Sequence, residues 1–360
     1  MNEMQQTQKI IEEINKNKEN IKIMHICGTH ERTISQYGIR SILPKNISIL
    51  SGPGCPVCVT PVDDIDTIII LAKKGFKIIT YGDMLRVPGT KESLFDARES
   101  GANVEMVYSI DDAIKIANKN NDENIIFFAI GFETTIPTVA NVIKKGIPKN
   151  MSIFTSLKLT PPAMEYLIKE SKVDAFIAPG HVATITGIEP FRIFETLNYP
   201  VVISGFEMID ILQSIFLLIL KLKDKKNHKK TKVFNEYKRC VSEKGNLIAM
   251  NLIKDVFDIT DSEWRGIGII KNSGLKIKDK YSIYDAKIKY KDLYYNDLKK
   301  IHAIVNKKNN LCICNEILTG KNTPNNCPMF KKQCNPKNPI GACMVSDEGM
   351  CFNWYKFRNS

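Results

Sequence analysis

The sequence lacks any long, uninterrupted hydrophobic run. Its longest apolar segment, residues 211–220, contains Gln213 and Ser214. This segment is far shorter than the roughly 20 apolar residues that a helix needs to cross a bilayer. The amino-terminal residues also lack the apolar core of a secretory signal peptide. We therefore expect a cytoplasmic protein with no membrane partner, in which residues 211–220 form a buried helix.

The sequence is also poor in arginine. Lysine supplies most of the 51 basic residues, which outnumber the 39 acidic residues and give a formal net charge of +12. The excess charge lies after Leu220, where no arginine-rich stripe alternates with aromatic residues. Scattered lysines usually form a solvated surface, and a chain rich in Lys, Ile and Asn is typical of an AT-rich genome. We predict no nucleic-acid partner, and a zinc-bearing nucleic-acid binder is the weakest alternative.

The length and apolar content predict two or three domains with real cores. The chain has 360 residues, of which 43% are hydrophobic, and it shows no internal repeat. This composition excludes a disordered tail and a small disulfide-stapled domain. The ten cysteines are therefore expected to be thiols or metal ligands in a reducing compartment.

Short apolar runs alternate with helical patterns up to about Leu220. This rhythm predicts an α/β fold with two Rossmann-like parallel-sheet lobes, at residues 20–120 and 121–222, divided near the polar stretch 118–123. Residues 223–360, possibly with 1–19, are expected to form a third, mainly helical domain closed by a cysteine-bearing coil. The expected strands are IKIMHI, NISIL, FKIITY, NVEMVYS, NIIFFAI, SIFTSL, DAFIAP and YPVVIS.

The loops after these strands are the places to look for a ligand site, because ligands of doubly wound folds bind at the carboxyl ends of the strands. The first loop places Cys27 next to His30 and Glu31, and His25 is expected to share a face with Cys27. A thiol, an imidazole and a carboxylate can hold a transition metal or activate a nucleophile. A buried free cysteine with a nearby capping histidine is an equally good interpretation.

The second loop carries the pair Cys55 and Cys58 within GPGCPVC. Thr60 and Pro61 predict a helix start just beyond the pair, with Thr60 as the N-cap. The partial positive charge of a helix amino terminus favours a thiolate at Cys58. A reactive dithiol is the favoured interpretation, although half of a zinc site has the same spacing.

Two further loops carry polar residues. In GFETTIP, Thr135 is expected to cap a helix and Glu133 to face the cleft between the lobes; the motif lacks the pattern of a phosphate-binding loop. His181 follows another strand, and the sequence leaves open whether it is an acid/base or a hydrogen-bonded loop residue.

Six cysteines lie between Cys312 and Cys351, a density that indicates zinc or an iron-sulfur cluster. Two tight CxxC knuckles, which are usual for structural zinc, are absent from this segment. The loose spacing of Cys314, Cys327, Cys334 and Cys351 favours an iron-sulfur cluster wrapped by coil. No role is evident for the isolated Cys240.

The motifs HICGTHE, GPGCPVC, GFETTIP and the cysteine tail with GACMVSDEG together resemble the HypD family of nickel–iron hydrogenase maturation factors. The resemblance covers nearly the whole chain. It implies two Rossmann-like lobes and a third domain with a 4Fe-4S cluster. It also implies a redox-active scaffold, rather than a conventional enzyme, on which an iron carrying cyanide and carbon monoxide is assembled together with a HypC-type chaperone. A HypE-type protein would supply the cyanide.

The resemblance also implies roles for individual residues. Cys27 would bind the iron jointly with a chaperone cysteine, and Cys55 and Cys58 would be the redox-active dithiol. The extra thiols Cys312 and Cys343 leave the choice of the four cluster ligands open. A general iron-sulfur thiol-disulfide oxidoreductase is the alternative function. The ligands that the resemblance implies for the 4Fe-4S cluster are Cys314, Cys327, Cys334 and Cys351.

Overall fold

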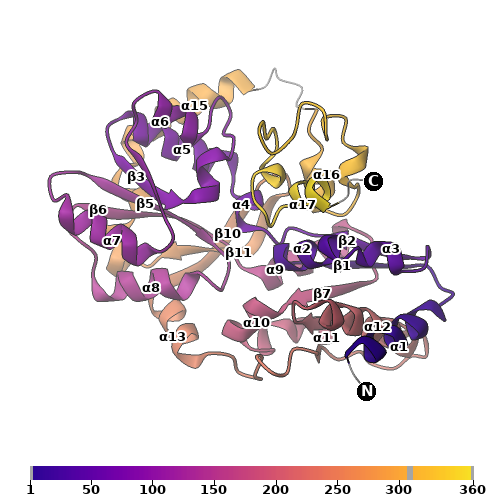
Figure 1. Ribbon diagram of the computed structural model, residues 1–360. Helices are drawn as coiled ribbons and strands as arrows, with labels where there is room; N and C mark the ends of the chain where they lie inside the picture. Colours follow the sequence, from indigo (N-terminus) through magenta and orange to yellow (C-terminus); the bar gives the residue numbers. More distant parts are fainter. Residues whose placement is uncertain (1–2, 306–310, 358–360) are drawn as a thin grey trace.

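Two parallel β-sheets and the helices around them make up most of the molecule, and a cysteine-bearing carboxyl-terminal segment packs on one of them (Figure 1). The computed structural model describes residues 3–305 and 311–357. All eight apolar runs expected to be strands form strands, so this part of the sequence prediction is confirmed.

The first sheet, sheet A, has the strand order β2-β1-β7-β8-β9, and all of its neighbouring strands are parallel. Its strands β1 and β7 pair in register from Ile23 opposite Ala175. The chain order changes direction between these two strands, which is the position where a doubly wound fold opens a crevice at its carboxyl edge. The strands are β1 (Ile21–His25), β2 (Ile47–Ser51), β7 (Ala175–Pro179), β8 (Val201–Ser204) and β9 (Phe234–Asn235).

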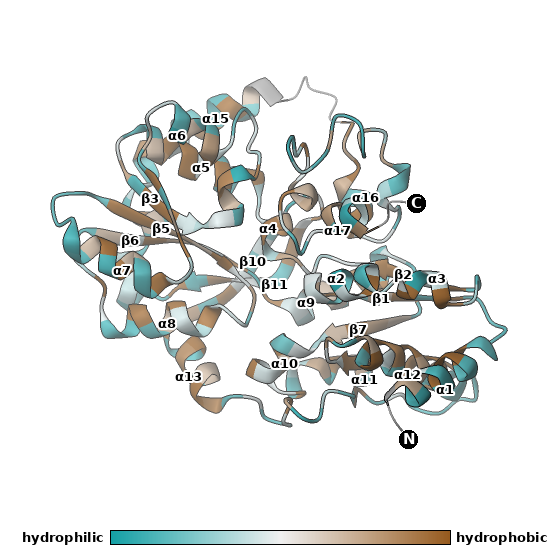
Figure 2. Cartoon of the chain, in the orientation of Figure 1, coloured by the Kyte–Doolittle hydropathy of each residue, from teal (hydrophilic) through white to brown (hydrophobic). Residues whose placement is uncertain are grey.

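The second sheet, sheet B, has the strand order β4-β3-β5-β6 and is also parallel throughout. Every residue of β5 and β6 is buried, as expected for parallel strands covered by helices on both faces. Figure 2 shows the strands of both sheets in the hydrophobic colour. The strands are β3 (Lys77–Tyr81), β4 (Val104–Val107), β5 (Ile125–Gly131) and β6 (Met151–Leu157).

The two sheets do not divide at the predicted boundary between residues 120 and 121. The chain forms β1 and β2 in sheet A, then all of sheet B, and then returns to sheet A for β7 and β8. Each lobe therefore combines strands from both predicted segments. The βαβ rhythm predicts strands but not their partners, because a crossover can lead into either sheet.

Helices cover the sheets and supply the apolar faces of the cores. Ile14 of α1 packs with Ile215 of α12 and with the strand residue Ile23 in one buried cluster. The apolar run 211–220 lies within α12, as predicted, and none of the described helices is long and apolar enough to cross a membrane. The helices up to this point are α1 (Glu3–Asn15), α2 (Gly28–Gln36), α3 (Ile39–Ile42), α4 (Pro56–Val59), α5 (Val62–Lys73), η1 (Gly82–Arg86), α6 (Leu94–Glu99), α7 (Ile110–Lys119), α8 (Ile136–Lys145), α9 (Thr160–Glu170), α10 (Gly180–Thr186), η2 (Glu189–Phe191), α11 (Ile193–Thr196) and α12 (Met208–Lys226).

Residues 223–305 do not form the separate, mainly helical domain that was predicted. β9 joins sheet A, and a long antiparallel hairpin of β10 (Phe257–Trp264) and β11 (Gly268–Ile277) packs against β6 and α9. These segments return to the lobes because their apolar residues complete the lobe cores. The remaining helices are α13 (Leu247–Val256), η3 (Asp279–Tyr284), α14 (Ala286–Lys289), α15 (Lys291–Val305), α16 (Cys314–Leu318), η4 (Pro324–Asn326), η5 (Ala342–Met344) and α17 (Met350–Phe357).

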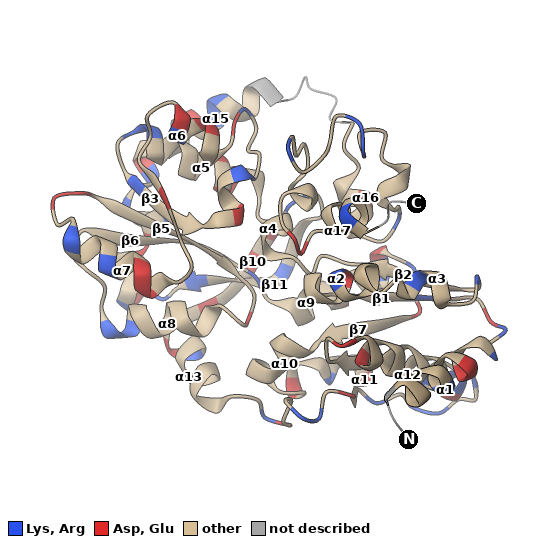
Figure 3. Ribbon diagram, in the orientation of Figure 1, with Lys and Arg blue, Asp and Glu red and all other residues tan. Residues whose placement is uncertain are grey.

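Basic and acidic side chains are interspersed over the surface (Figure 3). Several lysines of the basic carboxyl-terminal part form ion pairs, including Lys280 with Asp255 at 2.5 Å and Lys287 with Asp64 at 2.9 Å. Part of the lysine charge is therefore balanced locally by carboxylates.

The packing of α1 on α12 predicts that α1 belongs to the lobe of sheet A. Ile14 is fully buried, so Ile14→Ala should lower the free energy of unfolding by about 2–5 kcal/mol. Met4, on the same helix, is 81% exposed, and Met4→Ala should change it by less than about 0.5 kcal/mol. Urea unfolding of both variants measures the difference, and equal effects would contradict the docking of α1.

Candidate functional site

Cys27 lies at the carboxyl edge of sheet A, where β1 ends and α2 begins. It is the N-cap residue of α2, in an extended conformation, and it is buried. Burial and the nearby Glu348 carboxylate raise the pKa of the Cys27 thiol to about 12, although the backbone N–H groups of His30 and Thr29 oppose this shift. The thiol therefore holds its proton at neutral pH until a cation replaces it.

A buried ionic network supports the Cys27 loop. The Glu31 carboxylate accepts hydrogen bonds from His25 Nε2 at 2.9 Å, Ser35 Oγ at 2.6 Å, and both terminal nitrogens of Arg40 at 2.9 and 2.7 Å. Although burial raises the pKa of Glu31, the Arg40 charge and the His25 hydrogen bond hold it well below its usual value. His25 Nδ1 contacts the Cys27 carbonyl at 3.1 Å, so the network fixes the backbone that carries the thiol.

The His30 ring lies against the β8 loop. Its Nε2 donates to the Gly205 carbonyl at 2.9 Å, and the ring stacks on Phe206 with centroids 4.9 Å apart. Within the described residues, Nδ1 is buried and has no hydrogen-bond partner. Burial and the neighbouring His25 lower the pKa of His30 to about 3, so the ring is neutral at physiological pH. This geometry gives His30 a positioning role, and its catalytic role stays a prediction.

Cys55 and Cys58 are joined by a disulfide at the carboxyl edge beyond β2, with their Cα atoms 5.3 Å apart. Cys55 is the N-cap of α4, and its sulfur accepts a hydrogen bond from the Cys58 N–H at 3.2 Å. The predicted N-cap role of Thr60 is wrong: its hydroxyl donates to the Pro56 carbonyl, and α5 begins at Val62 with Pro61 in the cap position. Cys58 therefore lies inside the short helix α4 and not directly before the first turn of α5.

The two cysteine loops are packed directly together. The Gly28 N–H donates to the Gly54 carbonyl at 3.0 Å. A Cβ atom on Gly54 would overlap the backbone of Cys27, so this position needs glycine. The disulfide loop and the Cys27 loop therefore form one rigid unit.

The six tail cysteines form a single cluster of thiols. Cys343 donates a hydrogen bond to Cys314, with the sulfurs 2.8 Å apart, and this bond holds the pKa of Cys314 below its usual value. Burial and the other tail thiols raise the pKa of Cys351 well above its usual value. The thiols that raise it are those of Cys314, Cys312, Cys334 and Cys327.

These thiols fit a multinuclear cluster better than a single metal ion. Across residues 3–305 and 311–357, no three His, Cys, Asp or Glu side chains are arranged to hold one ion between them. A 4Fe-4S cluster binds each of four thiolates to a different iron, so its ligands surround a larger volume. Cys327, Cys334 and Cys351 are buried, and Cys314 adjoins them. The close approach of Cys343 to Cys314 keeps Cys343 a competing ligand.

The tail also covers the two cysteine loops. The Cys58 sulfur lies 3.9 Å from the Ala342 carbonyl, next to Cys343. Gly28 packs against Glu348, and a Cβ atom there would overlap the Glu348 side chain. Burial raises the pKa of Glu348 to about 7. Figure 1 shows the tail, in yellow, beside α4 and over α2.

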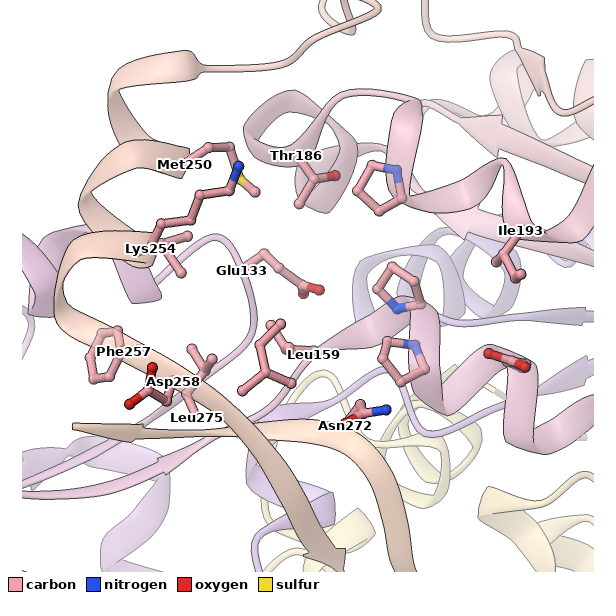
Figure 4. Close-up of a pocket in the computed structure, with 16 residues that line it drawn as sticks. Glu133, Leu159, Thr186, Ile193, Met250, Lys254, Phe257, Asp258, Asn272 and Leu275 are labelled. Carbon is pink, nitrogen blue, oxygen red and sulfur yellow. The ribbon is translucent and has the colours of Figure 1, made fainter. Parts of the chain in front are cut away.

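Glu133 faces a cavity of about 590 Å³ between the lobes, as the sequence predicted (Figure 4). Its carboxylate accepts hydrogen bonds from the Thr160 N–H at 2.7 Å and the Thr160 hydroxyl at 2.9 Å. Burial raises the pKa of Glu133 to about 7. Thr135 occupies the N-cap of α8 without a side-chain cap bond, and the exposed His181 stacks on Phe206 at 3.7 Å. Within the described part of the chain, neither Glu133 nor His181 forms a hydrogen bond to a cysteine sulfur.

Sequence reasoning missed Arg40, which binds Glu31 in the network that supports the Cys27 loop, and Glu348, which lies near Cys27. Arg40 lies in a segment without a recognisable motif. Glu348 lies in the tail, where the pattern of cysteines was the main signal. Their positions depend on how α3 and the tail fold back onto α2. The acidic stretch SDEG beside two tail cysteines was the available signal for Glu348.

Comparisons with known proteins agree on one family. The family model described as "HypD: Hydrogenase formation hypA family" matches residues 2–358. A putative hydrogenase expression/formation protein of Methanocaldococcus jannaschii is 45% identical over 359 residues, covering 97% of this chain and 96% of its own. The hydrogenase maturation factor HypD of Escherichia coli is 38% identical over 346 residues, covering 94% and 89%. That of Azotobacter vinelandii is 39% identical over 355 residues, covering 94% and 90%.

The Glu31 network predicts a pH-dependent loss of stability. Glu31→Gln leaves the Arg40 charge without its carboxylate and should lower the free energy of unfolding at pH 7 by about 3–5 kcal/mol. Because the folded-state pKa of Glu31 is depressed, this contribution is complete above the ordinary value of 4.5 and is lost as pH falls below it. The difference between wild type and variant should therefore shrink by up to about 1.4 kcal/mol per pH unit below that value.

Urea unfolding at pH 7 and at pH 4 measures this dependence. Glu13→Gln is the matched control, because Glu13 forms an exposed pair with Lys16 and should contribute less than about 0.5 kcal/mol. An effect of Glu31→Gln that is independent of pH would show that the carboxylate charge is not the stabilising element.

Proposed function

Because the chain belongs to the HypD hydrogenase formation family, we propose that this maturation factor is the scaffold on which an iron carrying cyanide and carbon monoxide is assembled. The iron is cargo, and the protein holds it while its ligands are added. A 4Fe-4S cluster in the tail and the Cys55–Cys58 pair are the proposed redox centres.

One observation carries the proposal: three sets of sulfur ligands meet at the carboxyl edge of sheet A. The Cys27 loop is bonded to the disulfide loop through Gly28 and Gly54, and the disulfide contacts the tail at Ala342. A site for iron, a two-electron thiol pair and a thiolate-rich tail are thereby brought side by side by separate parts of the sequence.

Cys27 is the proposed iron ligand of this chain. Thiolates suit a low-spin iron with strong-field ligands, and the thiol must lose its proton as the metal binds. The N–H groups of Thr29 and His30 stabilise the resulting thiolate. The Glu31 network holds the loop in place, so the sulfur does not have to reorganise when the iron arrives.

The Cys55–Cys58 pair is the proposed thiol redox centre. Reduction of its disulfide takes up two electrons and two protons, and oxidation of the dithiol returns them. A 4Fe-4S cluster held by the tail would supply or accept electrons one at a time. The tail holds Ala342 against Cys58 and so keeps the cluster-bearing segment beside this pair. The proposed cluster ligands are Cys314, Cys327, Cys334 and Cys351.

The proposed partners are a HypC-type chaperone and a HypE-type cyanide donor. The chaperone would contribute a second cysteine to the iron at Cys27, and the donor would deliver cyanide to the same atom. Both proposals follow from the family and from the position of Cys27 at the crevice of sheet A, where a doubly wound fold receives its ligand.

Burial of the disulfide argues against a general thiol-disulfide oxidoreductase. Cys55 and Cys58 are 3% and 1% exposed, and the tail lies over them. An enzyme that reduces unrelated protein disulfides needs an attacking sulfur that its substrates can reach. The dithiol is instead placed to serve a centre within the same protein.

Replacement of Cys27 should abolish cargo binding without unfolding the protein. In the anaerobic complex with the chaperone, Cys27→Ala should remove the infrared bands of metal-bound cyanide and carbon monoxide, because the chain loses its ligand. Cys240→Ala is the control, since Cys240 is exposed and lies outside the three sulfur sites, and its bands should be unchanged. Bands that persist in Cys27→Ala would exclude Cys27 as the ligand.

Replacement of the cluster ligands should remove iron and sulfide from the protein. Serine at Cys314, Cys327, Cys334 or Cys351 should reduce bound iron and the visible charge-transfer absorbance several-fold, because a 4Fe-4S cluster needs four thiolates. Serine at Cys312 or Cys343 should leave both near wild type. If the Cys343 variant loses the iron and the absorbance while one of the four ligand variants keeps them, Cys343 replaces that residue as a ligand. A colourless wild-type protein with stoichiometric zinc would contradict the proposed cluster.

A further inference from the structure

The turn between β10 and β11 is inserted among three of the sequence motifs. Trp264, at the end of β10, is buried and stacks on Phe132 of the GFETTIP motif with ring centroids 5.8 Å apart. The next residue, Arg265, donates its backbone N–H to the carbonyl of Val59 in α4 at 2.9 Å. The turn is therefore anchored to the disulfide helix and to a loop of sheet B.

The same turn contacts the cysteine tail. Gly266 has a φ of +72° and packs directly on Asn315, which follows Cys314 in α16. A Cβ atom at Gly266 would lie 3.0 Å from the Asn315 Cβ atom, so the turn packs closely on the tail and leaves no room for a larger residue. Arg265 is consequently held between the disulfide helix and the segment that carries the tail thiols.

The buried Arg265 side chain lies within electrostatic range of three of those thiols, Cys314, Cys343 and Cys312. It also lies within electrostatic range of the Asp66 carboxylate. Its Nη1 atom is buried and has no hydrogen-bond partner among the described residues. A guanidinium carries five N–H donors and stays charged in proteins, so a buried nitrogen without an acceptor indicates that an anionic group completes the site.

A thiolate-ligated cluster would be such an anionic group. Four thiolates and their cluster carry net negative charge, and one-electron reduction makes it more negative. A fixed positive charge beside the cluster therefore stabilises the reduced state over the oxidised state. The Asp66 carboxylate does not complete the site: its Oδ1 accepts the Thr90 N–H at 2.8 Å, and its buried Oδ2, like the Arg265 Nη1, has no hydrogen-bond partner among the described residues.

We propose that Arg265 is a positioning residue that compensates the negative charge of the tail thiolates and raises the reduction potential of the cluster they hold. The inference rests on the proposed function, because it requires a cluster in the tail. Arg265 forms no part of the ligand set and acts through its charge.

The test is a redox titration of the anaerobically purified full chain, followed by electron paramagnetic resonance. At the wild-type midpoint potential, Arg265→Gln should lower the ratio of reduced to oxidised cluster at least tenfold, a shift of about 59 mV for a one-electron couple. Arg265→Lys retains the charge and should stay within about threefold of wild type, or about half that shift.

Arg32→Gln and Arg86→Gln are the matched controls. Arg32 pairs with Asp347 at 3.4 Å, and Arg86 donates to the Lys337 carbonyl at 2.9 Å, so both contact the tail from exposed positions. Each should leave the midpoint unchanged. A wild-type midpoint in Arg265→Gln would overturn the inference, as would an equal shift in the controls.

Cluster content separates this inference from the function on which it rests. A wild-type protein without iron and sulfide would contradict the proposed cluster itself. If Arg265→Gln loses the cluster while Arg265→Lys keeps it, the positive charge is required and the inference is supported. If both variants lose the cluster, the shape of the arginine side chain matters instead of its charge, and the inference fails.

Discussion

The buried Glu31 carboxylate is the interaction on which the sulfur-rich edge of the molecule depends. It binds His25 at the end of β1 and both terminal nitrogens of Arg40. Arg40 in turn donates to the Ile49 carbonyl of β2 and lies over the Trp354 ring of α17, 5.5 Å from its centroid. One carboxylate thus connects two neighbouring strands, the helix after Cys27 and the last helix of the chain. A charge pair of this kind is expensive to bury, but once formed it fixes geometry more strictly than apolar packing does.

Glycine and burial complete the site that this network supports. Gly54 allows the disulfide loop to approach the Cys27 backbone, and Gly28 allows the tail to approach at Glu348. The close packing leaves Cys27 buried with a protonated thiol, which suits the proposed metal ligand better than an exposed nucleophile. The same packing places the Cys55–Cys58 disulfide against the tail. Each sulfur centre is therefore defined by contacts with the other two.

Eight strands and the grouping of the cysteines could be predicted from the sequence, whereas the pairing of the strands and the charged residues beside the cysteines could not. Although β9, β10 and β11 were missed, strands β1 to β8 were recognisable because buried parallel strands are nearly continuous apolar runs. Their division into two interleaved sheets was missed, because strand pairing is non-local. Cysteines are rare enough for their clusters to stand out, but Arg40, Arg265 and Glu348 are ordinary charged residues. Only the fold brings them to the sulfur atoms. The β10–β11 hairpin was also missed, because this segment was expected to be mainly helical. Its packing on β6 and α9 joins residues that are far apart in the sequence.

The position of the tail has a consequence for biosynthesis. Glu348 and α17 lie over the Cys27 loop, although more than three hundred residues separate them along the chain. Domains fold from the amino terminus as a chain leaves the ribosome, so both sheets can form while the tail is still being synthesised. Cys27 and the disulfide loop then remain uncovered until the final helix emerges. The enclosed site is consequently completed only after α17 has been synthesised, and a product truncated before this helix lacks it.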